Sequence, residues 1–134
     1  MPTNDFQVHD GLLAVQQTSE GDQLRLALEG EMDLANAETA DTVIREALAS
    51  GGAVVIDLGK LEFIDSTGIS VLVSVLRSRR DAELSFLPSE HESVRRLLSL
   101  TGLDERMGLA PVEALPSAAT SSAPASPEPL QPAA

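Results

Sequence analysis

The sequence contains no cysteine, tryptophan or tyrosine, and its single lysine is Lys60. Without cysteine the chain forms no disulfide and offers no thiolate to a metal or a substrate, which agrees with a reducing compartment. Aromatic residues make up only 2% of the chain. The core must therefore be built from aliphatic side chains, and the chain offers no aromatic platform on which nucleic-acid bases could stack.

Positive charge is also scarce, with 9 Lys and Arg against 21 Asp and Glu and a net charge of −12. Because phosphate binding needs clustered cations, we expect no direct nucleic-acid partner. No apolar run approaches the ~20 residues that span a bilayer, and the polar residues 1–5 lack a signal-peptide core. We therefore expect a soluble, cytoplasmic protein without membrane insertion.

The prolines divide the chain into two parts. Six of the eight prolines lie from Pro111 onward, in a region that is otherwise mostly Ala and Ser. Such a segment buries too little apolar surface to offset the entropy of ordering it. We predict one folded domain over residues 1–110 and a flexible tail over residues 111–134.

The hydrophobic pattern of the first part predicts the element order β-β-α-β-α-β-α. This order indicates an α/β fold with a mixed sheet and helices packed on one face. Residues 53–58 are a short, uniform apolar run, which predicts a strand buried on both faces. Ser89 and Glu92 have the spacing of a capping box for the last helix. The predicted strands are residues 6–16, 23–29, 53–58 and 83–87, and the predicted helices begin near residues 37, 66 and 89.

Residues 63–72 place an acid, two hydroxyls and a glycine where the third predicted strand gives way to a helix. Past Gly68 the apolar residues follow helical spacing, with Ile69, Leu72, Val73 and Leu76 on the inward face. Ser66 then lies near the helix N-cap. Its hydroxyl is either a plain cap or a phosphate acceptor, since amides and the positive end of the helix dipole converge there.

The histidines, Ser66 and Lys60 argue against catalysis. The only histidines, His9 and His91, belong to other predicted elements, and neither has a metal-ligand companion at helical spacing. Ser66 lacks the Gly-x-Ser-x-Gly setting of a hydrolase nucleophile, and no phosphate-binding loop precedes Lys60. We expect a protein that is not an enzyme and holds no cofactor or metal of its own.

Three short motifs carry a family resemblance. They are Gly30-Glu31-Met32-Asp33 after a strand, Asp65-Ser66-Thr67-Gly68-Ile69 followed by Leu72, and Thr101-Gly102-Leu103 after the last helix. In order and spacing they resemble STAS domains of the anti-sigma factor antagonist (anti-anti-sigma factor) family, over residues 1–110. The resemblance implies the STAS fold, which agrees with the predicted order of elements.

The resemblance also implies a phosphorylation-controlled cycle. The unphosphorylated protein binds an anti-sigma factor that is also a serine kinase, and so releases a sigma factor. The kinase phosphorylates Ser66, with Thr67 as the second choice, which ends the complex until a serine phosphatase resets it. The implied partner-binding residues are Glu31, Asp33, Asp65, Ser66, Thr67, Gly68, Val71 and Val75.

Several of these residues have simpler explanations. Val71 and Val75 fall on the helix side opposite Ile69, where they would be exposed to a partner or covered by the last helix. Glu31 and Asp33 could belong to a solvated loop, with Asp33 capping the next helix. As a whole, the chain could instead be a STAS adaptor in a stress-signalling or transporter-associated complex, or a small serine-dependent hydrolase.

Overall fold

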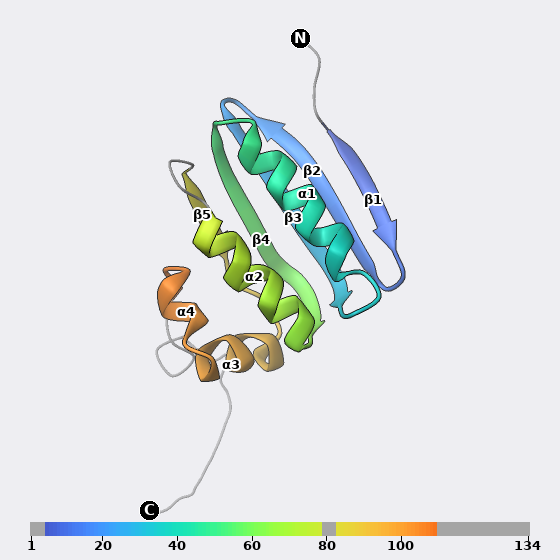
Figure 1. Ribbon diagram of the computed structural model, residues 1–134, viewed down its shortest axis with the longest axis vertical. Helices are drawn as coiled ribbons and strands as arrows, with labels where there is room; N and C mark the ends of the chain where they lie inside the picture. Colours follow the sequence, from blue (N-terminus) through green and yellow to red (C-terminus); the bar gives the residue numbers. More distant parts are fainter. Residues whose placement is uncertain (1–4, 79–82, 110–134) are drawn as a thin grey trace, which may run out of the picture.

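A computed structural model of the chain describes residues 5–78 and 83–109, and the predicted tail at residues 111–134 lies outside them. A five-stranded mixed sheet has the order β1-β2-β3-β4-β5, with β1 to β3 antiparallel and β3 to β5 parallel (Figure 1). The strands are Phe6–Asp10, Leu13–Glu20, Gln23–Met32, Ala53–Ile64 and Leu84–Leu87. The helices are α1 (Ala37–Ala49), α2 (Ser66–Ser78), α3 (Glu92–Leu100) and α4 (Leu103–Arg106).

The helices form a layer on the sheet. α1 and α2 lie side by side across one face, and α3 packs against β4 beside them (Figure 1). Alternate side chains of β2, β3 and β4 point into the core between sheet and helices, because successive strand residues face opposite sides. The predicted mixed sheet with helices on one face is confirmed. Fully buried core residues include Leu13, Val15, Leu26, Leu28, Ile56, Leu58, Ile44 and Leu72.

The opposite face of the sheet is open and polar. Asp57 of β4 forms an ion pair there with Arg25 of β3, and both side chains are partly exposed. Neighbouring Val55 is only half-buried. The prediction that residues 53–58 are buried on both faces is therefore wrong, because the only charge in this apolar run lies on a face that solvent reaches.

The strand boundaries also differ from the prediction. The predicted strand 6–16 is two strands, separated by a turn in which Gly11 has a positive φ of 61°. β4 continues to Ile64, and two β-bulges interrupt its register with β3. The bulges place Leu58, Leu61 and Ile64 in the core at three-residue spacing, which is not the alternation expected of a strand. A short α4 after Gly102 was also missed.

Ser89 does not form the predicted capping box. α3 begins at Glu92, and its N-cap residue His91 makes no side-chain cap. The buried Ser89 hydroxyl instead donates to the Leu61 carbonyl at 2.8 Å and accepts from the His91 amide at 2.9 Å. Glu92 pairs with Arg96 one turn on. Ser89 thus fastens the loop before α3 to β4.

Gly30 allows the β1–β2 turn to pack against β3. Its φ is +96°, and a Cβ atom there would lie 2.1 Å from the Leu12 carbonyl oxygen. That same oxygen accepts a hydrogen bond from the Glu31 amide at 3.0 Å. No L side chain fits such an approach, so a glycine is required at this position.

We predict that Gly30→Ala destabilises the domain by more than about 2 kcal/mol, from backbone strain and the forced retreat of the turn. Gly21→Ala is the matched control, because Gly21 also has a positive φ but its Cβ would meet nothing within 4 Å. It should cost only about 1–2 kcal/mol. Urea unfolding of both variants measures the difference, and equal losses would contradict the steric argument.

Candidate functional site

The candidate site lies where β3 and β4 end side by side. The chain leaves β3 into the loop before α1, and leaves β4 directly into α2. The Asp65 amide donates to the Met32 carbonyl at 3.1 Å, which ties the two exits together. Residues of the two motifs that are about 35 positions apart in sequence thus meet at one edge of the sheet.

Asp65 is the N-cap of α2. Its Oδ1 accepts hydrogen bonds from the amides of Thr67 (2.9 Å) and Gly68 (3.1 Å) and from the Thr67 hydroxyl. Its carbonyl accepts the first helical bond, from Ile69 at 2.9 Å. The cap position expected near Ser66 therefore belongs to the carboxylate one residue earlier, and Ser66 is the first residue of the helix.

These contacts hold Asp65 in its ionised form. The Thr67 hydroxyl, followed by the amides of Gly68, Thr67 and Leu34, lowers the pKa of Asp65 below its usual value. Hydrogen bonds to the charged form of a carboxyl favour that form. The Leu34 amide comes from the loop after β3, so one carboxylate organises both the start of α2 and the neighbouring loop.

Ser66 and Thr67 differ in how their hydroxyls are used. Ser66 is exposed, and within residues 5–78 and 83–109 its hydroxyl makes no hydrogen bond. Thr67 is half-buried, and its hydroxyl is engaged by Asp65 at 2.5 Å. Of the two, the Ser66 hydroxyl is the one presented to an approaching macromolecule.

Gly68 is buried and has a packing role. A Cβ atom there would lie 2.5 Å from Cγ1 of Ile64 and 3.2 Å from Cγ of Met32. The missing side chain allows the first turn of α2 to rest on the ends of β3 and β4. The prediction that Gly68 contacts a partner is therefore corrected, because the core already covers it.

The prediction that Val75 makes an apolar contact with a partner is corrected as well. Val75 has an exposed fraction of 0%, and Val71 is half-buried against the core. On the same side of α2, Ser74 and Ser78 accept hydrogen bonds from Arg45 of α1, the latter at 2.8 Å. This side of α2 was predicted to be exposed or covered by the last helix, but it lies along α1.

Glu31 and Asp33 lie at the end of β3 and in the loop that follows. Asp33 does not cap α1, whose N-cap is Asn36. Instead, Asp33 Oδ1 accepts from the Ala35 amide at 3.0 Å. The buried Asn36 side chain accepts from the Asp33 amide (2.9 Å) and donates to the Glu31 carbonyl (3.0 Å). Sequence reasoning missed Asn36, which fixes this loop from inside.

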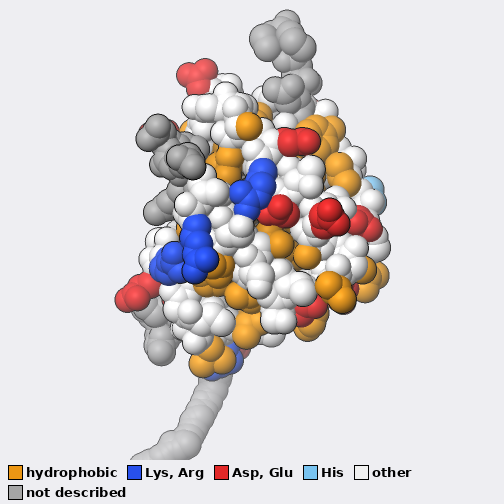
Figure 2. Space-filling model, viewed as in Figure 1, with side chains coloured by type: hydrophobic (Ala, Val, Ile, Leu, Met, Phe, Trp, Pro, Cys, Tyr) orange, Lys and Arg blue, Asp and Glu red, His pale blue; other side chains and the backbone are white. Residues whose placement is uncertain are grey.

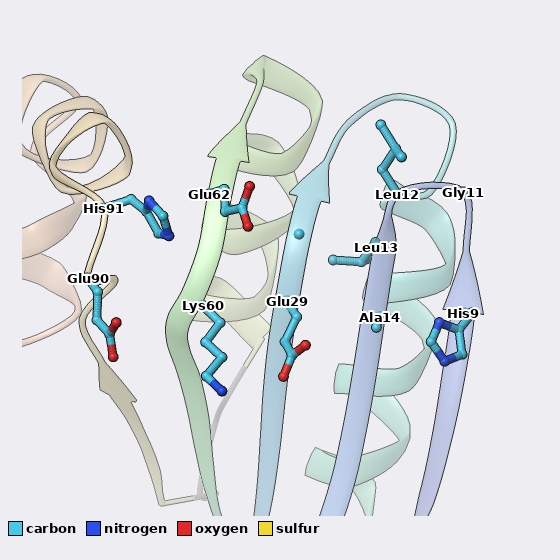
Figure 3. A pocket seen from close by; sticks show the side chains of 11 residues that line it. His9, Gly11, Leu12, Leu13, Ala14, Glu29, Lys60, Glu62, Glu90 and His91 are labelled. Atoms are coloured by element: carbon cyan, nitrogen blue, oxygen red, sulfur yellow. The ribbon is translucent and has the colours of Figure 1, made fainter.

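A shallow groove of about 610 Å³ crosses the open face of the sheet (Figure 3). Its floor is lined by Glu29, Lys60 and Glu62, and Leu12 of the β1–β2 turn lies at its upper end in that view. Across the described ranges no three His, Cys, Asp or Glu side chains are placed to hold a metal ion. In the same ranges no helix has the length and apolar character needed to cross a membrane.

Comparison with known proteins identifies the class. The family model described as "STAS domain" matches residues 14–115, most of the chain. The chain belongs to the STAS domain family, as the three motifs predicted.

Solved structures with the same fold include anti-sigma factor antagonists. One from Mycobacterium paratuberculosis is 25% identical with a TM-score of 0.67, over 74% of this chain and 86% of that one. The unphosphorylated form of the anti-sigma factor antagonist SpoIIAA is 23% identical with a TM-score of 0.55, over 74% and 90%. The phosphorylated form of the Bacillus cell fate determinant SpoIIAA is 22% identical with a TM-score of 0.52, over 74% and 93%.

We predict that Asp65→Asn lowers the melting temperature at pH 7 by a few degrees, because the neutral amide replaces an ionised cap. The folded pKa of Asp65 is depressed, so its stabilisation is present above the unfolded pKa and lost as pH falls through the folded value. The difference from wild type should therefore shrink below about pH 4. Thermal melts by circular dichroism test this, with Glu46→Gln, an exposed carboxylate of α1, as the control.

Proposed function

We propose that this protein is an anti-sigma factor antagonist whose binding is switched off by phosphorylation of Ser66. The unphosphorylated form binds an anti-sigma factor with serine kinase activity and thereby releases a sigma factor. The observation that carries the proposal is the Ser66 hydroxyl, exposed at the first residue of α2 and not used to hold the helix. Membership of the STAS domain family supports it.

A phosphate on Ser66 would change the surface and leave the fold intact. The group adds about −1.5 to −2 charge at a helix N-terminus, where the dipole favours it. The Asp65 carboxylate, however, already accepts from the Thr67 and Gly68 amides. The phosphate would therefore lie beside a fixed carboxylate with these amides occupied, and its charge would face outward toward the partner.

This placement explains why binding would end. An interface that accommodates a small hydroxyl would have to desolvate a dianion next to Asp65, which is costly without a paired cation. Each ~1.4 kcal/mol lost weakens affinity tenfold. Phosphorylation can thus dissolve a complex without unfolding either protein.

The likeness to SpoIIAA in both of its forms supports a switch that keeps the fold. The chain matches the unphosphorylated form with a TM-score of 0.55 and the phosphorylated form with 0.52. In the proposed cycle the kinase brings ATP and a separate serine phosphatase removes the phosphate. The absence of enzymatic activity in this chain and its cytoplasmic location stay predictions.

We predict that Ser66→Ala binds the anti-sigma factor but takes up no phosphate, whereas Thr67→Val is still phosphorylated. The Thr67 hydroxyl donates to Asp65, and Thr67 is half-buried. Its loss therefore removes a hydrogen bond of the helix cap but leaves the phosphate acceptor Ser66 in place. Mass spectrometry after incubation with the kinase and ATP measures both. Full phosphorylation of Ser66→Ala would move the acceptor to Thr67 or elsewhere.

Ser66→Asp tests the consequence of charge at the same position. We expect the variant to keep the wild-type circular dichroism spectrum and to bind the anti-sigma factor at least about tenfold more weakly. Ser70→Asp is the matched control, because Ser70 is also an exposed serine of α2, one turn further along. Equal binding by Ser66→Asp and wild type would contradict the switch.

A further inference from the structure

Three large apolar side chains are exposed at the end of the molecule that carries Ser66. Leu12 in the β1–β2 turn is 64% exposed, Leu34 in the loop after β3 is 77% exposed, and Phe63 near the end of β4 is 47% exposed. Single exposed apolar residues are common, but a group of them at one site marks an interaction surface. We call these three residues the apolar rim.

Backbone contacts hold the apolar rim together around one strand end. The Leu12 carbonyl accepts from the Glu31 amide, and Glu31 is the register partner of Phe63 across β3 and β4. The Leu34 amide approaches the Asp65 carboxylate, one residue before Ser66. Residues from a turn, a loop and the end of β4 therefore flank the proposed phosphorylation site.

The charged residues near the apolar rim are mostly acidic, although Lys60 lines the same groove as Leu12 and Glu62. Glu31 and Asp33 neighbour Leu34 along the chain, Glu62 and Asp65 neighbour Phe63, and residues 31–36 and 61–68 contain no lysine or arginine. Figure 2 shows hydrophobic and acidic side chains together at the lower right edge, where the β1–β2 turn and the start of α1 lie in Figure 1. The Lys and Arg side chains visible in that view lie near the centre, at the left and at the lower end.

We propose that the apolar rim is the main apolar contact for the anti-sigma factor, and that it meets an apolar surface bordered by lysine or arginine. The inference rests on the proposed function and deepens it. Charge complementarity selects this occupant, because a second copy of the chain would bring the same four carboxylates against one another. The partner's cations, drawn to the carboxylates, would lie close to Ser66.

The proposal replaces the contact once expected from α2. Val75 is buried and Val71 is half-buried, so α2 supplies the acceptor serine but little exposed apolar surface. Leu34 and Phe63 are each large enough to fill a pocket on the partner, as the few dominant residues of an interface usually do. Phosphate added to Ser66, next to Asp65, would then oppose burial of the whole rim.

The test uses the full chain with the paired changes Leu34→Ser and Phe63→Thr, since threonine retains strand propensity. Leu100→Ser is the control, because Leu100 at the end of α3 is 78% exposed, like Leu34. The probes are the ATP-binding anti-sigma factors encoded in the same genome, titrated by calorimetry. We expect the paired variant to bind at least about tenfold more weakly, and the control to match wild type.

Each other outcome overturns the inference in a recognisable way. Wild-type affinity in the paired variant, with Ser66→Asp still weakened, rejects the apolar rim but leaves the proposed function standing. A wild-type protein that binds none of the anti-sigma factors rejects both. A wild-type dimer in analytical ultracentrifugation that the paired variant abolishes would assign the surface to self-association. If the paired variant shows no cooperative melt by circular dichroism, it is unfolded. Leu34→Ser alone is then tested in its place, and it should still bind the anti-sigma factor more weakly than wild type.

The charge of the site gives an independent measurement. Glu31→Lys should slow association with the same anti-sigma factor and reverse part of its salt dependence, because electrostatic steering acts mainly on the association rate. Glu46→Lys, on the exposed side of α1, carries the same charge change away from the apolar rim. Equal association rates for the two variants would contradict a basic partner surface at the rim.

Discussion

The Asp65 carboxylate is the interaction on which the rest of the site depends. One oxygen accepts from two amides of the first turn of α2 and from the Thr67 hydroxyl, and the Leu34 amide also approaches this carboxylate. Because Asp65 caps the helix, the Ser66 hydroxyl is not needed to stabilise the first turn of α2. A hydroxyl that holds nothing can be modified without loss of the fold, and this is what a phosphorylation switch requires.

The packing around this cap determines which side chains a partner can reach. Gly68 lets α2 rest on Ile64 and Met32, and Arg45 of α1 holds the flank of α2 through Ser74 and Ser78. Most of the apolar surface of α2 is therefore buried. Near the start of α2, the exposed apolar side chains come instead from the β1–β2 turn, the loop after β3 and the end of β4. The proposed binding surface is thus built from three chain segments that only the sheet brings together.

Sequence reasoning succeeded where a local pattern has a single meaning. The mixed sheet, the helix after Asp65 and the family were all predicted from periodicity and three short motifs. It failed where tertiary packing chooses between equal local options. The valines of α2 have the same side-chain chemistry on either side of the helix, and only the position of α1 decides that Val75 is buried. Ser89 had capping-box spacing but bonds to β4.

The sequence by itself determined that Asp65, Ser66 and Gly68 lie within four residues, where a strand pattern gives way to a helix pattern. Only the tertiary structure decided which structural role each of these residues has. It assigned the cap to Asp65, burial to Gly68 and exposure to Ser66. It also placed Leu12, Leu34 and Phe63 beside them, since β-bulges and loop contacts depend on strand register, which no local pattern specifies.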